Sequence, residues 1–139
     1  MATFFVPGIP VPKGSAKAFM RKGMRFPVVI QDNADKQKPW ASIIGVTAAG
    51  VIAQPTTQPV KLEVAFWMPR PKAHLGKAGV KDNAPFRHTK KPDLDKLLRC
   101  VKDALTGIAW IDDSQVCDVV CSKNYAISPG AGITITPLN

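Results

Sequence analysis

The segment after Asp93 has an apolar pattern that an α-helix can bury along one side. Its apolar residues recur at spacings of three and four, which define one face of a helix. They are Leu94, Leu97, Leu98, Val101, Ala104 and Leu105. Gly107 follows them and is a natural helix end. The sequence therefore predicts a helix that begins near Asp93 and ends before Gly107.

The opposite side of this helix carries charged residues. Asp95, Arg99 and Lys102 are spaced by four and then three, so their side chains share one face. Asp93 and Asp95 would point about 200° apart if both were helical. For both to bind one ion, Asp93 must lie on the extended segment before the helix, and Pro92 tolerates that position. Either aspartate can instead cap the helix start.

These carboxylates are unexpected in so basic a chain. Its 139 residues include 19 Lys and Arg against 10 Asp and Glu, a net charge of +9, and the positive excess lies before residue 103. Such a field suits a polyanion such as nucleic acid, whereas carboxylates repel phosphate. A divalent cation explains both observations, because carboxylates hold it and it bridges them to a phosphodiester. The first interpretation is a metal-dependent nuclease.

A second aspartate pair, Asp112 and Asp113, follows the helix. A strand is expected over residues 115–125, and adjacent side chains on a strand point to opposite faces. At most one of the two aspartates is therefore expected to face a metal. Asp-Asp-Ser is also an ordinary turn sequence, so the pair could serve only as a turn.

The remaining chain alternates between strand-like and helical segments in a single domain, residues 1–139. Strands are predicted at residues 3–6, near a sheet edge, and at 26–30, 60–68 and 115–125, with a second helix from 35 to about 52. The basic, glycine-containing stretch 13–25 is predicted to be a loop or a loose hairpin. These elements indicate an α+β fold.

A basic segment at residues 69–91 has no periodicity. Long loops of this kind are functional or disordered, and here we expect mobility in the free protein and order on a phosphate backbone. Together with the N-terminal basic stretch and the charged helix face, this segment supplies the predicted DNA contacts. They are Lys13, Lys17, Arg21, Lys22, Arg70, Lys72, Arg87, Lys90, Lys91, Lys96 and Lys102.

Histidines and cysteines offer weaker candidates. His74 and His88 could be a base or zinc ligands, but no partner histidine or cysteine stands at zinc spacing. Cys117 and Cys121 share strand parity and are predicted to be buried small hydrophobes. The odd cysteine count, the lack of a visible signal peptide and the lack of a membrane-length apolar run predict a cytoplasmic protein without a membrane partner.

The aspartate motifs and the helix between them resemble the RusA family of Holliday junction resolvases of bacteria and their phages. The similarity is carried by Lys91-Pro92-Asp93-Leu94-Asp95-Lys96-Leu97-Leu98-Arg99, by Lys102-Asp103-Ala104-Leu105, and by Trp110-Ile111-Asp112-Asp113-Ser114-Gln115-Val116. Pro7-Gly8-Ile9-Pro10-Val11-Pro12-Lys13-Gly14 resembles phage members. The resemblance implies a homodimer whose subunits have a small mixed sheet and two main helices. It also implies a Mg²⁺-dependent enzyme, with Mn²⁺ as an alternative ion, that nicks two opposed strands of a four-way junction.

The resemblance also implies roles for particular residues. The family's catalytic, metal-binding carboxylates correspond to Asp93, Asp95 and Asp113. Its asparagine after the second aspartate is Lys96 here, and its functional lysine is Arg99, which takes the place of a catalytic cation. Arginine keeps the charge but cannot readily give up a proton. If the family's lysine only stabilises charge, Arg99 can replace it. If that lysine transfers a proton, Lys96 or Lys102 would have to take over this step.

Two other functions fit the same residues. A basic DNA-binding protein without catalysis would use its aspartates only as caps and turns, although a pure binder needs no acidic pair beside its basic face. A less selective flap or branched-DNA nuclease would share the metal chemistry. The sequence does not separate this nuclease from a junction resolvase.

Overall fold

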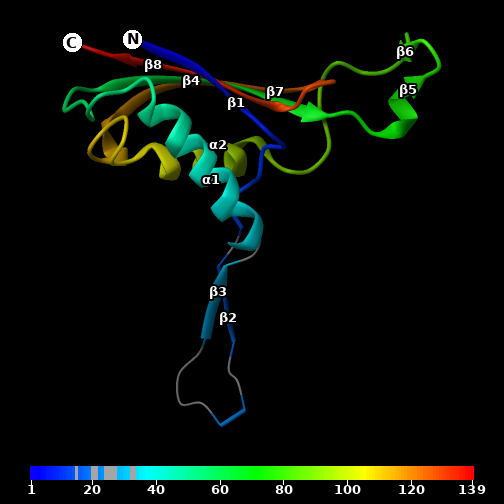
Figure 1. Cartoon of the computed structure of the whole chain (residues 1–139). Coiled ribbons are helices and arrows are strands. Elements are labelled where there is room, and N and C mark those ends of the chain that lie inside the picture. Colours follow the sequence, from blue (N-terminus) through cyan, green and yellow to red (C-terminus); the bar gives the residue numbers. More distant parts are fainter. Residues whose placement is uncertain (15, 20–21, 24–27, 32–33) are drawn as a thin grey trace.

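The protein has an α+β fold in which helices cover one face of a sheet. The computed structural model describes residues 1–14, 16–19, 22–23, 28–31 and 34–139. Within these residues, two α-helices, α1 (Ala34–Ala49) and α2 (Leu94–Leu105), pack together against a four-stranded sheet (Figure 1). The predicted combination of a small mixed sheet and two main helices is confirmed.

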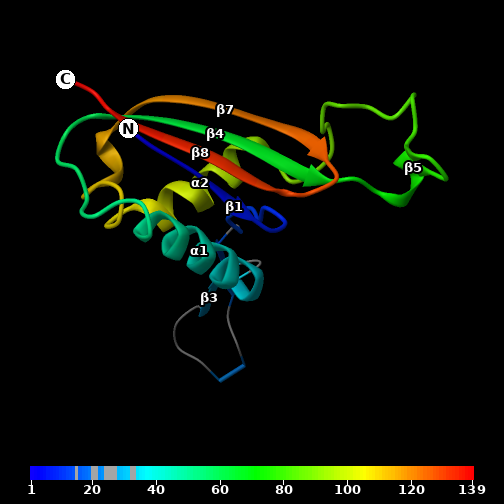
Figure 2. The same ribbon diagram turned by 45° about the horizontal axis from the view of Figure 1, so that its top comes forward.

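The sheet is mixed because one of its strand pairs is parallel. Its strands are β1 (Ala2–Pro7), β4 (Val60–Pro69), β7 (Val116–Ala126) and β8 (Gly130–Pro137), in the order β1-β8-β4-β7 (Figure 2). β8 is antiparallel to β1 and β4, whereas β4 and β7 are parallel. Parallel neighbours need a crossover connection, and α2 lies in the one between β4 and β7. Both aspartate pairs belong to this crossover.

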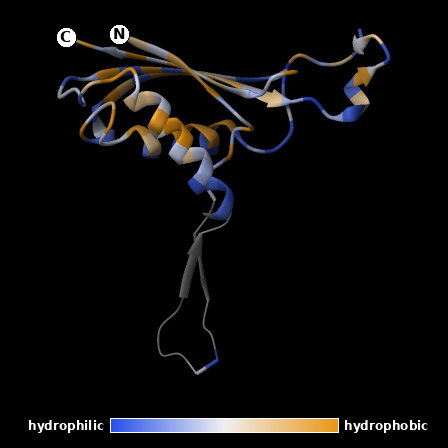
Figure 3. Cartoon of the chain, in the orientation of Figure 1, coloured by the Kyte–Doolittle hydropathy of each residue, from blue (hydrophilic) through white to orange (hydrophobic). Residues whose placement is uncertain are grey.

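The core lies between the sheet and the helices, where Figure 3 shows the apolar stretches of both helices beside the strands. Alternate residues of β4 are buried, as predicted for a half-buried strand: Val60, Leu62, Val64, Phe66 and Met68. On α2, Leu97, Val101 and Leu105 are fully buried. The apolar face predicted for this helix is confirmed, and Cys100 adds to it.

α2 ends as the sequence predicts. Gly107 has a φ of +90°, a left-handed conformation that favours glycine. Its N–H donates to the carbonyl of Trp110 at 2.7 Å, and the indole N–H of buried Trp110 donates to Thr106 Oγ1 at 3.1 Å. The turn that leads to Asp113 is therefore anchored in the core.

The first helix is shorter than predicted. The sequence predicts a helix to about residue 52, and α1 ends at Ala49. Ile43 and Val51, both inside the predicted helix, are exposed, whereas Trp40, Ile44 and Ala48 belong to the core. The N–H groups of Val51 and Ile52 both approach the carbonyl of Ala48, so the chain turns there.

The central strand β8 is not among the predicted strands. Ile133 and Ile135 are buried and alternate with half-buried Thr134 and Thr136, which is a strand pattern. The signal is present in the sequence, but Pro129, Gly130 and Gly132 around it weaken it. The expected edge position of the first strand is confirmed, since β1 lies at one end of the sheet.

Two small hairpins project from this body. β2 (Ala16–Phe19) and β3 (Val28–Gln31) pair antiparallel, so the described strand of the basic N-terminal stretch is one arm of a hairpin (Figure 1). The strand predicted at 26–30 begins in residues outside the described ones, and β3 covers its second half. In the 69–91 segment, η1 (Lys72–His74), β5 (Leu75–Gly76) and β6 (Gly79–Val80) form short elements that the sequence does not predict.

The prediction that Cys117 is a buried hydrophobe is wrong. Cys117 is exposed, and Cys121 is half-buried against the core. The reason is that β7 is the other edge strand, and its first half is mostly exposed. Among the described residues, no helix has the length and apolar character needed to cross a membrane.

Candidate active site at the start of α2

Asp93 stands at the start of α2 with a carboxylate that the helix does not use. Its backbone is extended, with φ −70° and ψ 145°, and its carbonyl accepts from the Leu97 N–H at 3.2 Å. Its side chain accepts no capping hydrogen bond, although an aspartate at this position usually does. The predicted extended position is confirmed. The exposed carboxylate remains available for another partner.

Lys123 of β7 holds the segment that leads to Asp93. Its ammonium donates to the carbonyl of Lys90 at 2.7 Å and to that of Pro92 at 2.8 Å. In addition, the His88 N–H donates to the Lys123 carbonyl at 3.4 Å. The sequence interpretation missed Lys123, although it is the one basic residue among residues 103–139, a stretch with four aspartates.

The N-terminal chain crosses the first turn of α2 from the other side. The Lys13 N–H donates to the Lys96 carbonyl at 3.0 Å, and the Lys13 ammonium pairs with Asp103 further along the helix. The side chain of Lys13 is 31% exposed. Lys13, a predicted DNA contact, is therefore engaged with its own chain.

Asp112 and Asp113 have different environments. Asp112 accepts from the Ser114 N–H at 2.9 Å, and the Gln115 side chain accepts from the Asp112 N–H at 2.8 Å. These bonds form a capping box on η2 (Asp113–Gln115), and the hydrogen bonds from Ser114 lower the pKa of Asp112. Gln115 also donates to the Thr56 carbonyl at 2.9 Å. Asp112 thus has a structural role that Asp113 does not share.

Asp113 pairs instead with a residue of α2. Its Oδ2 lies 3.4 Å from Lys102 Nζ. Lys102 is on the helix face that also carries Asp95 and Arg99, both of which are exposed. Arg99 makes no ion pair within the part of the chain that the structure describes. The charged face predicted for the helix therefore extends across to the turn before β7.

The three predicted metal ligands are not gathered into one cluster. Among the described residues, no three His, Cys, Asp or Glu side chains lie close enough together to hold an ion. Asp93 and Asp95 lie at the first turn of α2, whereas Asp113 pairs with Lys102, whose Cα lies about 11 Å beyond that of Asp95 along the axis. The donor type suits Mg²⁺, which prefers carboxylate oxygen. The oxygen donors of Asp93, Asp95 and Asp113 therefore suit the ion, but the three side chains are not grouped around one point.

The two histidines pack on an aromatic ring. The rings of His74 and His88 contact Tyr125 edge-on, with centroids 4.8 and 4.9 Å away. Arg70 lies over the same ring at 5.4 Å and donates to the Pro85 carbonyl at 2.8 Å. These contacts fasten the 69–91 segment to β7. A zinc site at these histidines finds no support in the described residues.

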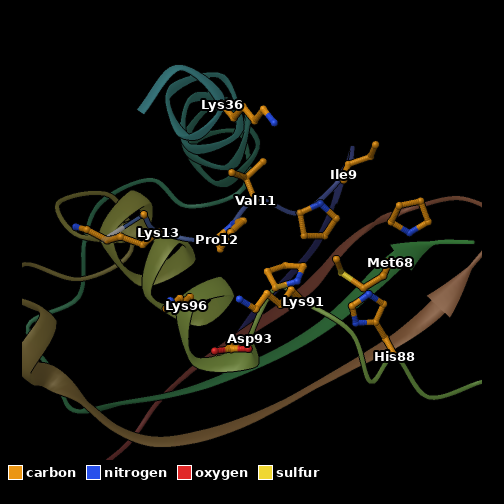
Figure 4. Close-up of a pocket in the computed structure, with 14 residues that line it drawn as sticks. Ile9, Val11, Pro12, Lys13, Lys36, Met68, His88, Lys91, Asp93 and Lys96 are labelled. Carbon is orange, nitrogen blue, oxygen red and sulfur yellow. The ribbon is translucent and has the colours of Figure 1, made fainter. Parts of the chain in front are cut away.

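A cavity of about 560 Å³ lies beside Asp93 (Figure 4). Its walls are formed by residues 9–14, the end of β4, His88 and the start of α2. The lysines that line it among the described residues are Lys13, Lys36, Lys91 and Lys96. Lys36 of α1 was not among the predicted contacts, because it lies outside the two basic segments and the helix face from which they were taken.

The other predicted DNA contacts differ in their surroundings. Lys22, Lys72, Lys90 and Lys91 are exposed. Arg87 donates to Asn124 Oδ1 at 3.2 Å. Lys17 is a position in β2, and Arg21 lies outside the described residues.

The fold and the charged start of α2 define a small α+β protein with acidic groups set in a basic surface, as in enzymes that process nucleic acid. Residues 7–136 match the family described as Endodeoxyribonuclease RusA, and the chain belongs to this family. The chain is also 33% identical over 136 residues to "Uncharacterized protein YqaN" of Bacillus subtilis (strain 168). That alignment covers 95% of this chain and 93% of the relative. The family resemblance seen in the aspartate motifs is confirmed.

Proposed function

We propose that this protein is a metal-dependent endodeoxyribonuclease that resolves four-way DNA junctions by paired symmetric nicks in recombination and repair. The observation that carries the proposal is the uncapped carboxylate of Asp93 at the basic start of α2, in a member of the RusA endodeoxyribonuclease family. The helix lacks the stabilising hydrogen bond that an N-cap carboxylate usually accepts from a backbone N–H of the first turn. A ligand role for Asp93 explains that loss.

Asp93, Asp95 and Asp113 would hold Mg²⁺, or Mn²⁺ in its place. The bound ion supplies an activated water for in-line attack and neutralises charge on the phosphate. Within the described residues, Asp93 and Asp95 have no ion pair or side-chain hydrogen bond, which leaves their oxygens available. Asp113 is held by Lys102 and would exchange this cation for the metal.

Two basic residues near the carboxylates would act on the phosphate. Arg99 lies one turn beyond Asp95 with an exposed side chain, so its guanidinium can stabilise charge that develops in the transition state. Lys96 lines the cavity beside Asp93 and can bind the same phosphate or its neighbour.

The remaining basic residues would bind the arms of the junction. The exposed lysines Lys22, Lys72, Lys90 and Lys91 would contact phosphates. Contacts of this kind recognise the shape of the DNA rather than its sequence. Two symmetric cuts call for two sites, so we propose a homodimer acting in the cytoplasm of a bacterial or phage-infected cell.

The open face of the sheet offers an apolar surface that a second copy of the chain could cover. The sheet face opposite the helices exposes Phe5 of β1 and Val120 of β7, at 48% and 56%. Both side chains lie on strands at the two edges of the sheet. Sedimentation at micromolar protein that shows a species of twice the 15.0 kDa chain mass would support the dimer.

A synthetic four-way junction tests the proposed function. Incubation with Mg²⁺ should give paired nicks in opposed strands, and EDTA should abolish them, while plain duplex stays uncut. Equal cutting of flap substrates would favour the less selective branched-DNA nuclease. Tight binding without any cutting would favour the non-catalytic DNA-binding protein.

A further inference from the structure

The cavity beside Asp93 is larger and more apolar than a phosphate contact needs. Its volume of about 560 Å³ falls within the range of about 300–1,000 Å³ found for pockets that bind small organic ligands. Pro10 and Met68 in its wall are buried, and Val11 is half-buried against the core. An anion gains no free energy from contact with an apolar wall, whereas the flat, apolar face of a heterocycle is stabilised by such contact.

Besides Lys13, whose ammonium pairs with Asp103, three lysines bring positive charge to this cavity. Lys36 comes from the first turns of α1, Lys91 from the segment before α2, and Lys96 from the first turn of α2 (Figure 4). Asp93 is the acidic side chain among the described lining residues. An apolar wall with ammonium groups around it matches a nucleotide, which combines an apolar base face with an anionic phosphate.

His88 also lines the cavity. The residue is 8% exposed, and its Nδ1 has no hydrogen-bond partner within the part of the chain described. Burial, and then the nearby charge of Lys123, lower the pKa of His88, so the ring is neutral near neutral pH. A buried polar atom without a partner costs free energy. A ligand that supplies the missing hydrogen bond would remove that cost.

We propose that this cavity receives one unstacked nucleotide of the cleaved DNA strand, adjacent to the scissile phosphate. Its base would lie against Val11 and Met68 with an edge toward His88, and its phosphate would lie near Lys36. This proposal rests on the proposed function, because DNA must be the substrate and Asp93 part of the site. Unstacking is least costly where bases are already poorly paired, as at a branch point. The cavity would then give the enzyme a preference for certain bases at its cut site.

The fluorescence of 2-aminopurine, which rises when the base leaves the helical stack, tests the proposal. A set of four-way junctions would each carry one 2-aminopurine at a different position around the branch point. Wild-type protein would be added in EDTA, so that no strand is cut. The fluorescence should rise strongly at one position next to the cut site and little elsewhere. No rise at any position would overturn the proposal.

Variants with matched controls identify the cavity as the receiving site. Val11→Phe fills it and Lys36→Ala removes a charge from it, so both should lose most of the fluorescence rise. The controls are Val46→Phe and Lys38→Ala on α1, which are exposed and do not line the cavity. Circular dichroism shows whether Val11→Phe is folded, and Lys36→Ala, at an exposed position, tests the same point without that risk. Equal losses in a variant and its control would contradict the assignment.

His88→Phe tests whether the polar atom selects the base. The phenyl ring can keep the contact with Tyr125 but has no hydrogen-bonding atom. Cleavage rates of junctions that differ only in the base at the identified position should converge, with discrimination falling roughly threefold to tenfold. Unchanged discrimination would remove His88 from the proposal. A protein that cuts junctions without a fluorescence rise keeps the proposed function and loses this inference. A rise without cutting in Mg²⁺ would contradict the proposed function and, with it, the assignment of the nucleotide to a cleaved strand.

Discussion

Lys102 Nζ lies 3.4 Å from Asp113 Oδ2, so an ammonium group flanks one of the three carboxylates proposed to bind the metal. Lys102 is 23% exposed and Asp113 48%, which makes the pair a surface ion pair. Such pairs contribute about 0–1 kcal/mol to stability. The pair is therefore expected to affect metal binding by Asp113 more than the stability of the fold.

Lys102→Met should lower the Mg²⁺ concentration needed for half-maximal junction cleavage. The ammonium competes with the metal, and a unit charge about 4 Å away in water is worth about 1 kcal/mol, or about fivefold in affinity. Lys102→Arg keeps the charge and should retain the wild-type requirement. A higher Mg²⁺ requirement in Lys102→Met would show that Lys102 assists the metal or the phosphate instead.

Neighbouring aspartates should respond differently to the same substitution. Asp113→Asn should abolish cleavage while junction binding is kept or strengthened, because it removes a metal ligand and a charge that repels phosphate. Asp112→Asn should keep the capping box, because its amide oxygen can still accept from the Ser114 N–H, and should retain both the thermal midpoint and most activity. Single-turnover cleavage and thermal unfolding of both variants measure the contrast. Wild-type cutting by Asp113→Asn would remove Asp113 from the site.

Arg99→Ala should slow cutting far more than it weakens binding. Only interactions that are stronger in the transition state than in the ground state raise the rate of the chemical step. Loss of a charge-stabilising donor typically costs roughly 10²–10³ in rate. Arg99→Lys should keep substantial activity because it keeps the charge. If Arg99→Ala cuts at the wild-type rate while Lys96→Ala is inactive, the catalytic cation is Lys96.

The sequence predicted the parts of the fold in which local pattern and packing agree. Leu97, Val101 and Leu105 of the predicted stripe are fully buried, and Gly107 follows the end of α2. Val60 and its alternate neighbours face the core. In contrast, Cys117 was expected to be buried because parity shows which residues share a face but not whether anything covers that face. The position of β7 at a sheet edge decides this, and strand order is a property of the whole fold.

The candidate site was predictable only in part for a related reason. Asp93 and the turn at Asp113 follow from motifs within one crossover, which local spacing describes. Lys36 and Lys123 come from distant segments, α1 and β7, and only the packing brings them to the start of α2. The sequence pattern likewise gives no sign that His88 is buried with an unpartnered nitrogen.

Lys123→Met should reduce cleavage without removing a phosphate contact. The ammonium donates to the carbonyls of Lys90 and Pro92, so its loss frees the segment before Asp93. We expect a lower single-turnover rate together with faster amide hydrogen exchange in residues 86–92. Lys90→Met is the matched control, because its exposed side chain is expected to bind DNA and its loss should weaken binding. A Lys123 variant with normal rate and normal exchange would contradict the positioning role.

The stability of the protein should fall in mild acid through His88. Burial lowers the pKa of this residue below its ordinary value of 6.5, so above about pH 7 the ring is neutral in both the folded and the unfolded chain. Below about pH 6.5 the unfolded chain takes up a proton first, and the free energy of unfolding then decreases until the pH reaches the lower pKa of the folded state. His88→Gln has no such group and should lose less stability between about pH 7.5 and about pH 5.5. Urea unfolding of both proteins at the two pH values measures the difference, in which the contributions of all other groups cancel. An equal loss in the two proteins would show that His88 is protonated as readily in the folded chain as in the unfolded one.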